Sequence, residues 1–181
     1  MKFGKLIYRF IIGTVRSSNT IGHPRKSVSS EPLCAPGVLL EGQAIEIHDG
    51  DTVDVLLSGN SVRIRLAAID CPERDQSWGN VAREELSRLI VGRTLYLETY
   101  GTDPHGRQLA TIYVMQGTEL INVNEQMVMR GHAWVMRLYY GCLSRSRQHQ
   151  LNRLERWAKS KHVGLWKFEN PIPPWQWRKT G

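Results

Sequence analysis

Cysteine is scarce in this 181-residue sequence, and long apolar runs are nearly missing. The three cysteines, Cys34, Cys71 and Cys142, occur in no C-x-x-C spacing, which excludes the common zinc-binding patterns and a disulfide framework. A single disulfide, with one thiol left over, is compatible with an oxidising compartment. Beyond the N-terminal segment no stretch is long and apolar enough to span a membrane. The sequence therefore predicts a protein with no stable membrane span.

Acidic residues are lacking at both ends of the chain, although the protein has 17 of them against 24 Lys and Arg. Residues 1–30 carry six basic residues and no acidic one, and residues 137–181 carry ten basic and two acidic ones. Residues 31–136 carry eight basic and fifteen acidic residues. This distribution predicts an acidic body that would bind a cation, between basic ends that would attract a polyanion. On charge alone, basic helices that are only solvated faces are an equal alternative.

The N-terminal segment MKFGKLIYRFIIGTV has a basic start and an apolar run, which Arg9 interrupts. It is a candidate signal peptide or anchor, although no convincing cleavage site follows it. Residues 16–41 are rich in Ser, Pro and Gly and are typical of a linker. We expect a basic N-terminal segment and linker at 1–41, a folded domain at 42–166 and a Pro/Trp-rich basic tail at 167–181, which is extended. Export is favoured, a cytoplasmic location is still open, and we expect a monomer.

Within the folded domain the spacing of apolar residues changes several times. Alternation predicts strands at 42–50, 52–58, 61–69, 93–100 and 108–115, and an extended stretch at HAWVM. A helical period around 82–90 ends at Gly92, a short helix is expected at 121–130, and a long basic helix at 144–162. Five strands with a helix inserted after the third predict an α+β fold, a five-stranded OB-type barrel capped by about three α-helices.

Acidic residues gather around the second and third predicted strands, in HDGDTVDVLLSGNSVRIRLAAIDCPE at 48–73. Asp51 and Asp70 follow strand-like runs whose ends can meet on one rim, where paired carboxylates resist ionising together unless a cation is present. Oxygen ligands favour calcium or magnesium. An EF-hand is excluded, because the sixth position from Asp49 is Asp54 rather than Gly and the twelfth is Asn60 rather than Glu.

The neighbouring side chains suggest a use for such a cation. Arg65 and Arg107 can bind the charge that grows on a phosphoryl group, and Glu73 can orient or deprotonate water. Together with a metal ion, these are the parts that phosphodiester hydrolysis requires. The structural alternative is an acidic turn with ordinary surface arginines, which explains the clustering poorly.

Five motifs extend the pattern: DGDTV at 49–53, RLAAIDCPE at 65–73, GTDPHGRQLA at 101–110, VNEQMVMRG at 123–131 and GLW at 164–166. With them the chain, from about Gly42 to Trp166, resembles the staphylococcal nuclease (thermonuclease) family. The resemblance implies an OB barrel and calcium-dependent hydrolysis of DNA and RNA to products with 3′-phosphate ends. It implies that calcium is bound by the carboxylates of Asp51 and Asp70 and by the main-chain carbonyl of Cys71.

The same resemblance assigns the water to Glu73 and the phosphate to Arg65 and Arg107. Asp49, Thr52 and Asp103 are expected to support these groups. Two departures concern Cys71, where staphylococcal nuclease itself has threonine, and the nucleotide-binding tyrosines. His105 and Arg137 replace two of these, and Tyr139 keeps its ring, so the base preference is open.

Two other functions compete with an active nuclease. A non-catalytic OB-fold module that binds nucleic acid would have no reason to keep Asp51, Arg65, Asp70, Glu73 and Arg107 together. A protein whose basic ends bind membranes would need an amphipathic basic helix, and 144–162 fits this only partly, because its apolar stripe is needed by the barrel. In the nuclease the basic residues of this helix would attract the substrate; they are Arg145, Arg147, Arg153, Arg156 and Lys159.

Overall fold

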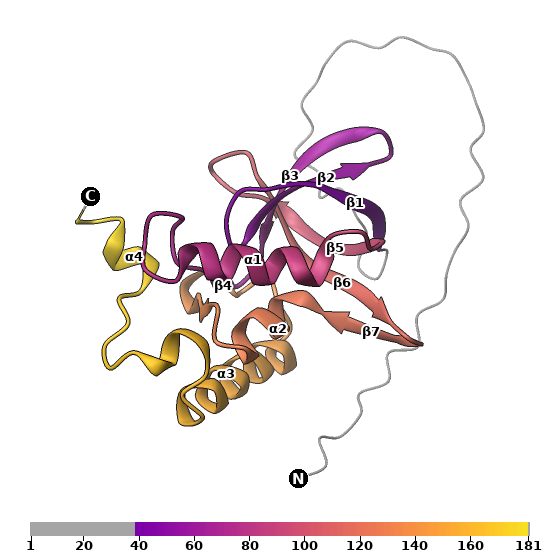
Figure 1. Ribbon diagram of the computed structural model, residues 1–181. Helices are drawn as coiled ribbons and strands as arrows, with labels where there is room; N and C mark the ends of the chain where they lie inside the picture. The colour runs from indigo at the N-terminus through magenta and orange to yellow at the C-terminus, as the bar shows by residue number, and fades with distance from the viewer. Residues whose placement is uncertain (1–38, 181) are drawn as a thin grey trace, which may run out of the picture.

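Alternating apolar residues form the strands of a closed barrel in residues 39–180, the part of the chain that the computed structural model describes (Figure 1). The predicted signal or anchor and Cys34 lie outside the described residues. The barrel strands are β1 (Leu40–Ile47), β2 (Thr52–Leu57), β3 (Asn60–Leu66), β5 (Leu95–Thr102) and β6 (Gln108–Gln116). They pair antiparallel in the order β3-β2-β1-β5-β6, and a parallel pairing of β3 with β6 closes the ring. The predicted five-stranded OB-type barrel is confirmed.

One face of each barrel strand fills the interior with β-branched and aliphatic side chains. Val53, Val55, Ile64, Leu97 and Ile112 have no exposed surface. Between β3 and β6 the register pairs Arg65 with Leu109, and between β2 and β3 it pairs Thr52 with Arg65. The pairing therefore places the end of β3 beside the start of β2, where the acidic motifs lie.

The sequence pattern did not predict two short strands, β4 and β7, as separate elements. β4 (Ile69–Asp70) pairs with β8 (Trp134–Val135), so Asp70 lies opposite Trp134. β7 (Glu119–Asn122) pairs with the end of β6, which means that the helix predicted at 121–130 begins only after it. Asn122 ends β7 and caps the following helix, since its side chain accepts a hydrogen bond from the backbone N–H of Glu125.

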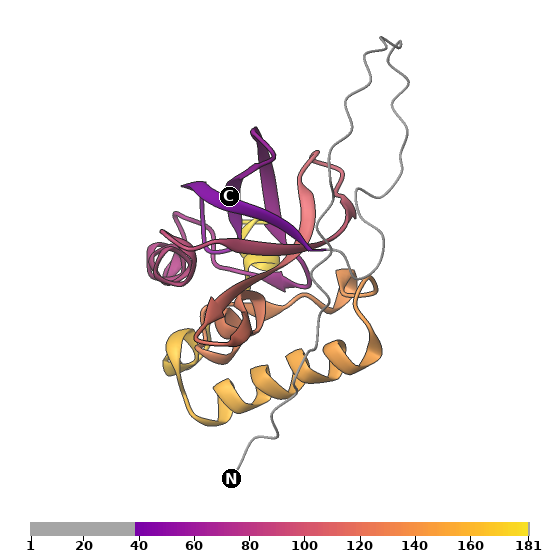
Figure 2. The same ribbon diagram turned by 90° about the vertical axis from the view of Figure 1, so that its right-hand side faces the viewer.

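Three helices cover the barrel, as expected: α1 (Gly79–Ile90), α2 (Val123–Met129) and α3 (Arg145–Ser160). Both Figures 1 and 2 show α2 between the barrel and α3. The α3 helix turns Leu151, Leu154 and Ala158 inward and begins at the cap residue Ser144. None of the helices within residues 39–180 has the length and apolar character needed to cross a membrane.

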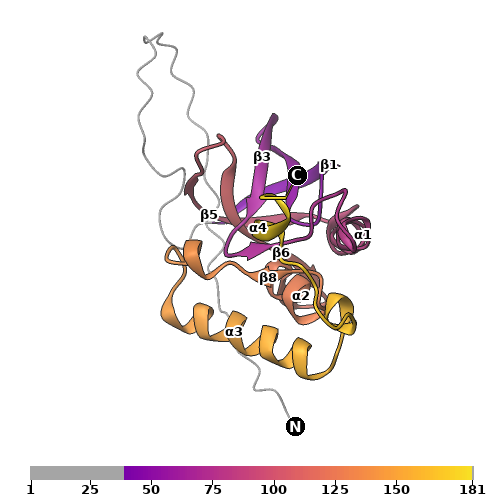
Figure 3. The ribbon, with the colours of Figure 1, turned by 90° about the vertical axis from the view of Figure 1, so that its left-hand side faces the viewer.

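The C-terminal tail differs from the prediction. It was expected to be extended, but residues Pro174–Trp177 form the short helix α4, which follows a 3-10 turn at Gly164–Lys167. Proline is tolerated in the first helical turn, because the missing N–H has no partner there, and Pro174 occupies this position. The short helix lies on the side of the molecule that faces the viewer in Figure 3, and its Trp175 packs edge-on against Trp134 of β8.

Candidate active site

The turn between β1 and β2 places the first predicted metal ligand. The backbone N–H of Asp51 donates to Oδ1 of Asp49 over 2.9 Å, and the hydroxyl of Thr52 donates to Oδ1 of Asp51 over 3.2 Å. Asp49 and Thr52, two of the three residues predicted to support the site, therefore contact Asp51. Gly50 is required in this turn, because a Cβ there would lie 2.7 Å from the Cβ of Cys71.

Arg65 connects the two predicted metal ligands. Its Nη1 lies 3.1 Å from Oδ2 of Asp51, and its Nη2 lies 2.8 Å from Oδ1 of Asp70. Nη1 also donates to the carbonyl oxygens of Leu66 and Ile69, each over 2.9 Å. The arginine thus holds Asp51, on the β1–β2 turn, and Asp70, on β4, in one buried cluster. The sequence prediction that these three residues lie together agrees with this geometry.

Asp51 and Asp70 have only 4% and 1% of their surface exposed. Burial, together with the nearby carboxylates of Asp49 and Asp70, raises the pKa of Asp51 although Arg65 acts in the opposite direction. The backbone N–H of Cys71 also donates to Oδ2 of Asp51 over 2.6 Å. The cluster therefore contains more negative charge than Arg65 can balance.

Cys71 contacts this cluster through its backbone, and its thiol is buried in the core. Burial and the charge of Asp51 raise the pKa of the thiol well above its ordinary value. A thiol in this state is a poor nucleophile, since the thiolate is the reactive form. Its side chain is thus a packing group, which is compatible with a role for the main chain alone.

Glu73 follows three residues after Asp70, and its side chain is 32% exposed. The loop that contains it packs tightly on the start of α1: a Cβ on Gly79 would lie 1.8 Å from the carbonyl oxygen of Glu73. Gln76 accepts a hydrogen bond from the Glu73 backbone N–H over 3.1 Å. The backbone of Glu73 is therefore held in place, and its carboxylate lies at the open side of the cluster.

The sequence analysis did not identify Arg178, the most direct neighbour of Glu73. Its Nη1 lies 2.5 Å from Oε1 of Glu73, and its Nη2 lies 2.7 Å from Oδ2 of Asp70. Burial alone would lower the pKa of Arg178, but the bonds and charges of Asp70 and Glu73 raise it. No spacing in the sequence indicates this contact, because Asp70 and Arg178 are 108 residues apart.

Arg107 lies in the loop between β5 and β6 and binds Asp103. Its Nη2 lies 2.7 Å from Oδ2 of Asp103, and the backbone N–H groups of His105 and Arg107 both donate to Oδ1. Burial would raise the pKa of Asp103, but the bonds from Arg107 lower it below its ordinary value. Asp103 thus holds the backbone and the side chain of Arg107. Within residues 39–180 no polar contact joins Arg107 to Asp51, Asp70 or Glu73.

The residues expected to bind the nucleotide lie on the surface. His105 is exposed in the Arg107 loop, and Tyr139 has 65% of its surface exposed. Arg137 instead makes an ion pair of 2.5 Å with Glu155, a residue of α3 that is 1% exposed. That ion pair gives Arg137 a structural task, and its contact with a base stays a prediction.

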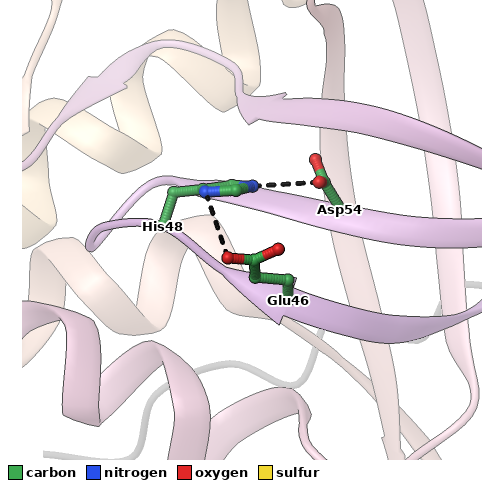
Figure 4. Close-up of side chains that lie close together, drawn as sticks. All are labelled: Glu46, His48 and Asp54. Atoms are coloured by element: carbon green, nitrogen blue, oxygen red, sulfur yellow. Dashed lines mark ion pairs between the residues drawn. The ribbon is translucent and has the colours of Figure 1, made fainter.

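A different acidic group has the closest approach to a metal-binding geometry. Among the described residues, the ligand atoms of Glu46, His48 and Asp54 lie within 4.8 Å of one another (Figure 4). However, Asp54 already accepts two hydrogen bonds from Arg63, which are the main reason that its pKa falls to about 2. Because Arg63 balances the carboxylate of Asp54, this group is explained as an ion-pair cluster.

Comparison of the sequence with known proteins finds one matching protein family and several relatives. The family model described as "Staphylococcal nuclease homologue" matches residues 63–168. A protein named "Micrococcal nuclease" from Shigella flexneri is 36% identical over 144 residues, which cover 77% of this chain and 80% of that protein. "Protein ParB" of Escherichia coli is 37% identical over 145 residues, with the same two shares of coverage. An "Uncharacterized endonuclease" of Escherichia coli O157:H7 is 36% identical over 146 residues, covering 81% of this chain and 88% of that protein.

Proposed function

Since this chain belongs to the staphylococcal nuclease family, we propose that it is a calcium-dependent nuclease, which hydrolyses phosphodiester bonds of DNA or RNA to products with 3′-phosphate ends. The observation that supports this most directly is the buried cluster in which Arg65 joins Asp51 to Asp70, with Glu73 at its open side. A module that only binds nucleic acid has no need of buried carboxylates, which repel the phosphate backbone.

The residues of the cluster fit a hard cation. The side chains of Asp51, Asp70 and Glu73 provide only oxygen, as does the main chain of Cys71, and calcium prefers oxygen ligands. Asp49 adds a further carboxylate next to Asp51, so the four carboxylates of the cluster outnumber its two guanidiniums, those of Arg65 and Arg178. A bound calcium ion would supply Lewis acidity toward a phosphoryl oxygen.

The protein side chains have separate tasks in this proposal. Arg65 keeps the two buried carboxylates in place and presents positive charge to the phosphate. Glu73 accepts a proton from the attacking water, for which its partly exposed position is suitable. Asp103 orients the fork of Arg107, which binds phosphate oxygens in a bidentate manner. The water oxygen bonds to phosphorus as the bond between phosphorus and the 5′-oxygen breaks, and the 5′-oxygen takes up a proton from solvent water.

Calcium dependence is tested on a single-stranded DNA oligonucleotide. We expect cleavage with calcium and its abolition by a calcium chelator, and we expect phosphatase to remove a phosphate from the new 3′ ends. Asp51→Asn should lose calcium-dependent cleavage, because it removes a predicted ligand, whereas Asp54→Asn on the following strand β2 should keep it. Full activity in chelator would exclude the metal assignment, and loss of activity in Asp54→Asn alone would transfer it to the Glu46, His48 and Asp54 group.

The basic residues of α3 divide into two kinds. Arg153 and Arg156 are exposed, as the attraction of a polyanion requires. Arg147 was expected to act with them, but only 16% of its side chain is exposed, and it binds Glu98 over 2.7 Å as well as the hydroxyls of Tyr100 and Tyr113. Its charge is therefore used inside the protein, where it anchors α3 to β5 and β6.

Replacing Arg153 and Arg156 with Gln should weaken substrate binding and leave turnover at saturation unchanged. Each phosphate that is no longer neutralised lowers the slope of log K against log salt by about 0.7–0.9, so the slope should fall by about one to two. Equilibrium binding at several salt concentrations measures it, with Lys161→Gln and Lys167→Gln as the control of equal charge. An unchanged slope would show that α3 is only a solvated face.

A further inference from the structure

The last residues of the chain form an arm that is anchored beside the active site. This C-terminal arm comprises residues 169–180. The side chain of Gln76, in the same loop as Glu73, donates to the carbonyl oxygen of Ile172 over 2.6 Å. Pro174 is buried, and the ring of Trp175 packs edge-on against Trp134 at 6.4 Å between centroids. The arm is thus attached both to the loop of Glu73 and to β8.

This anchoring brings Arg178 to the two carboxylates. Trp134 is the strand partner of Asp70, so the residue that packs against Trp175 is also the neighbour of a predicted metal ligand. The α4 turn continues to Arg178, whose backbone N–H donates to the carbonyl of Pro174 over 2.9 Å. The arm runs along the loop between β4 and α1, since Ile172 bonds to Gln76 and Arg178 pairs with Glu73 (Figure 1). The position of the guanidinium therefore results from the two attachments of the arm and from the helical turn that follows them.

The contacts of Arg178 occupy the oxygens that a cation would need. Oδ1 of Asp70 accepts from Arg65 over 2.8 Å, and Oδ2 accepts from Arg178 over 2.7 Å, so both oxygens of this buried carboxylate have a guanidinium partner. Arg178 also lies 2.5 Å from Oε1 of Glu73, the group assigned to the water. Arg65 is fixed in the barrel by two carbonyl oxygens as well, whereas Arg178 has 45% of its side chain exposed and comes from the arm. Of the two, Arg178 is the one that can leave.

We infer that Arg178 competes with the divalent cation for the carboxylates of Asp70 and Glu73, so that the C-terminal arm sets the calcium concentration at which the enzyme becomes active. This inference rests on the proposed calcium site. A cation that binds Asp70 must displace Arg178, because the two would otherwise meet at the same oxygen and repel each other. The apparent affinity for calcium is then reduced by the fraction of molecules in which Arg178 is bound. Once displaced, the guanidinium also frees Glu73 to accept a proton.

Calcium binding by the full chain, measured by isothermal titration calorimetry without substrate, tests the inference. Arg178→Gln should bind calcium about three- to tenfold more tightly than the wild type, the range expected when a partly exposed ion pair no longer competes. Arg178→Lys should lie between the two, since an ammonium lacks the fork that spans both carboxylates. The control Lys179→Gln removes the same charge from the next, exposed residue and should change the affinity little.

Three outcomes would overturn the inference, and they can be told apart. Equal calcium affinities of Arg178→Gln and Lys179→Gln would show that Arg178 does not compete. A higher Michaelis constant in Arg178→Gln, with calcium affinity unchanged, would make Arg178 a phosphate ligand instead. If none of the proteins binds calcium, the calcium site fails first, and the inference fails with it. If the calcium concentration for half-maximal cleavage falls by the same factor as the calorimetric dissociation constant, both the calcium site and the competition by Arg178 are supported.

Discussion

Glu73→Gln is expected to lower turnover by about 10²–10⁴-fold, the contribution typical of a general base. This corresponds to about 3–5 kcal/mol in the activation free energy. The reason is that glutamine keeps the shape of the side chain but cannot accept the proton of the attacking water. Affinity for the oligonucleotide should stay the same or improve slightly, because a negative charge leaves an anion-binding site.

Steady-state kinetics at saturating calcium measure this change, and the exposed Glu84 provides the control. Glu84→Gln on α1 removes a carboxylate of 63% exposure that pairs with Arg88, so its kinetics should equal those of the wild type. Calcium must be saturating, because Glu73→Gln also removes a partner of Arg178 and changes the competition for the cation. Lost affinity with normal turnover would show that Glu73 binds substrate or metal and is not the base.

Arg65→Gln should destabilise the fold as well as the chemistry. The change leaves Asp51 and Asp70 buried without their shared partner, and breaking a buried ion pair from one side costs about 3–5 kcal/mol in the free energy of unfolding. Calcium should restore part of this loss if it binds the same carboxylates, because binding to the native state alone adds stability. Activity should fall below detection even in calcium.

Urea denaturation with and without calcium measures the effect, and Arg63→Gln is the matched control. Arg63 lies two residues earlier on β3 and pairs with Asp54, but its side chain is 53% exposed, so its loss should matter much less. A similar loss of stability in both variants would mean that the buried ion pairs of Arg65 contribute no more to stability than the exposed ion pair of Arg63. If calcium does not reduce the loss of stability in Arg65→Gln, Asp51 and Asp70 are not ligands of the metal.

The local sequence predicts the barrel and most of the cluster, because both depend on features that repeat at short range. Alternation in SVRIRLAAI turns Ile64 and Leu66 to the core, and the length of this strand then places Arg65 at the rim. The β2–β3 hairpin fixes the distance between Asp51 and Arg65 through a register of six residue pairs. The requirement for Gly50 is not local, since a Cβ there would meet the side chains of Cys71 and Ala82.

Predictions from the sequence alone were wrong where a residue type occurs in two different structural environments. The charge of Arg147 suggested a residue that attracts the substrate, but the hydroxyls of Tyr100 and Tyr113 and the carboxylate of Glu98 compensate it inside the protein. The prolines of the tail suggested an extended chain, but Pro174 begins a helical turn. In both cases the deciding partners belong to other elements of the fold, so no window of the sequence contains them.

The sequence by itself determined the barrel, the acidic turns and the separation of Asp51 from Arg65, because strand period and turn geometry act over a few residues. Only the tertiary structure decided which cations reach the carboxylates. Arg107 binds Asp103 in its own loop. Arg178 pairs with Asp70, although it comes 108 residues later in the sequence. That pairing depends on the packing of Trp175 against Trp134 and on the bond from Gln76 to Ile172. Contacts of such long range follow from how surfaces fit together, and a linear pattern of residues does not record that fit.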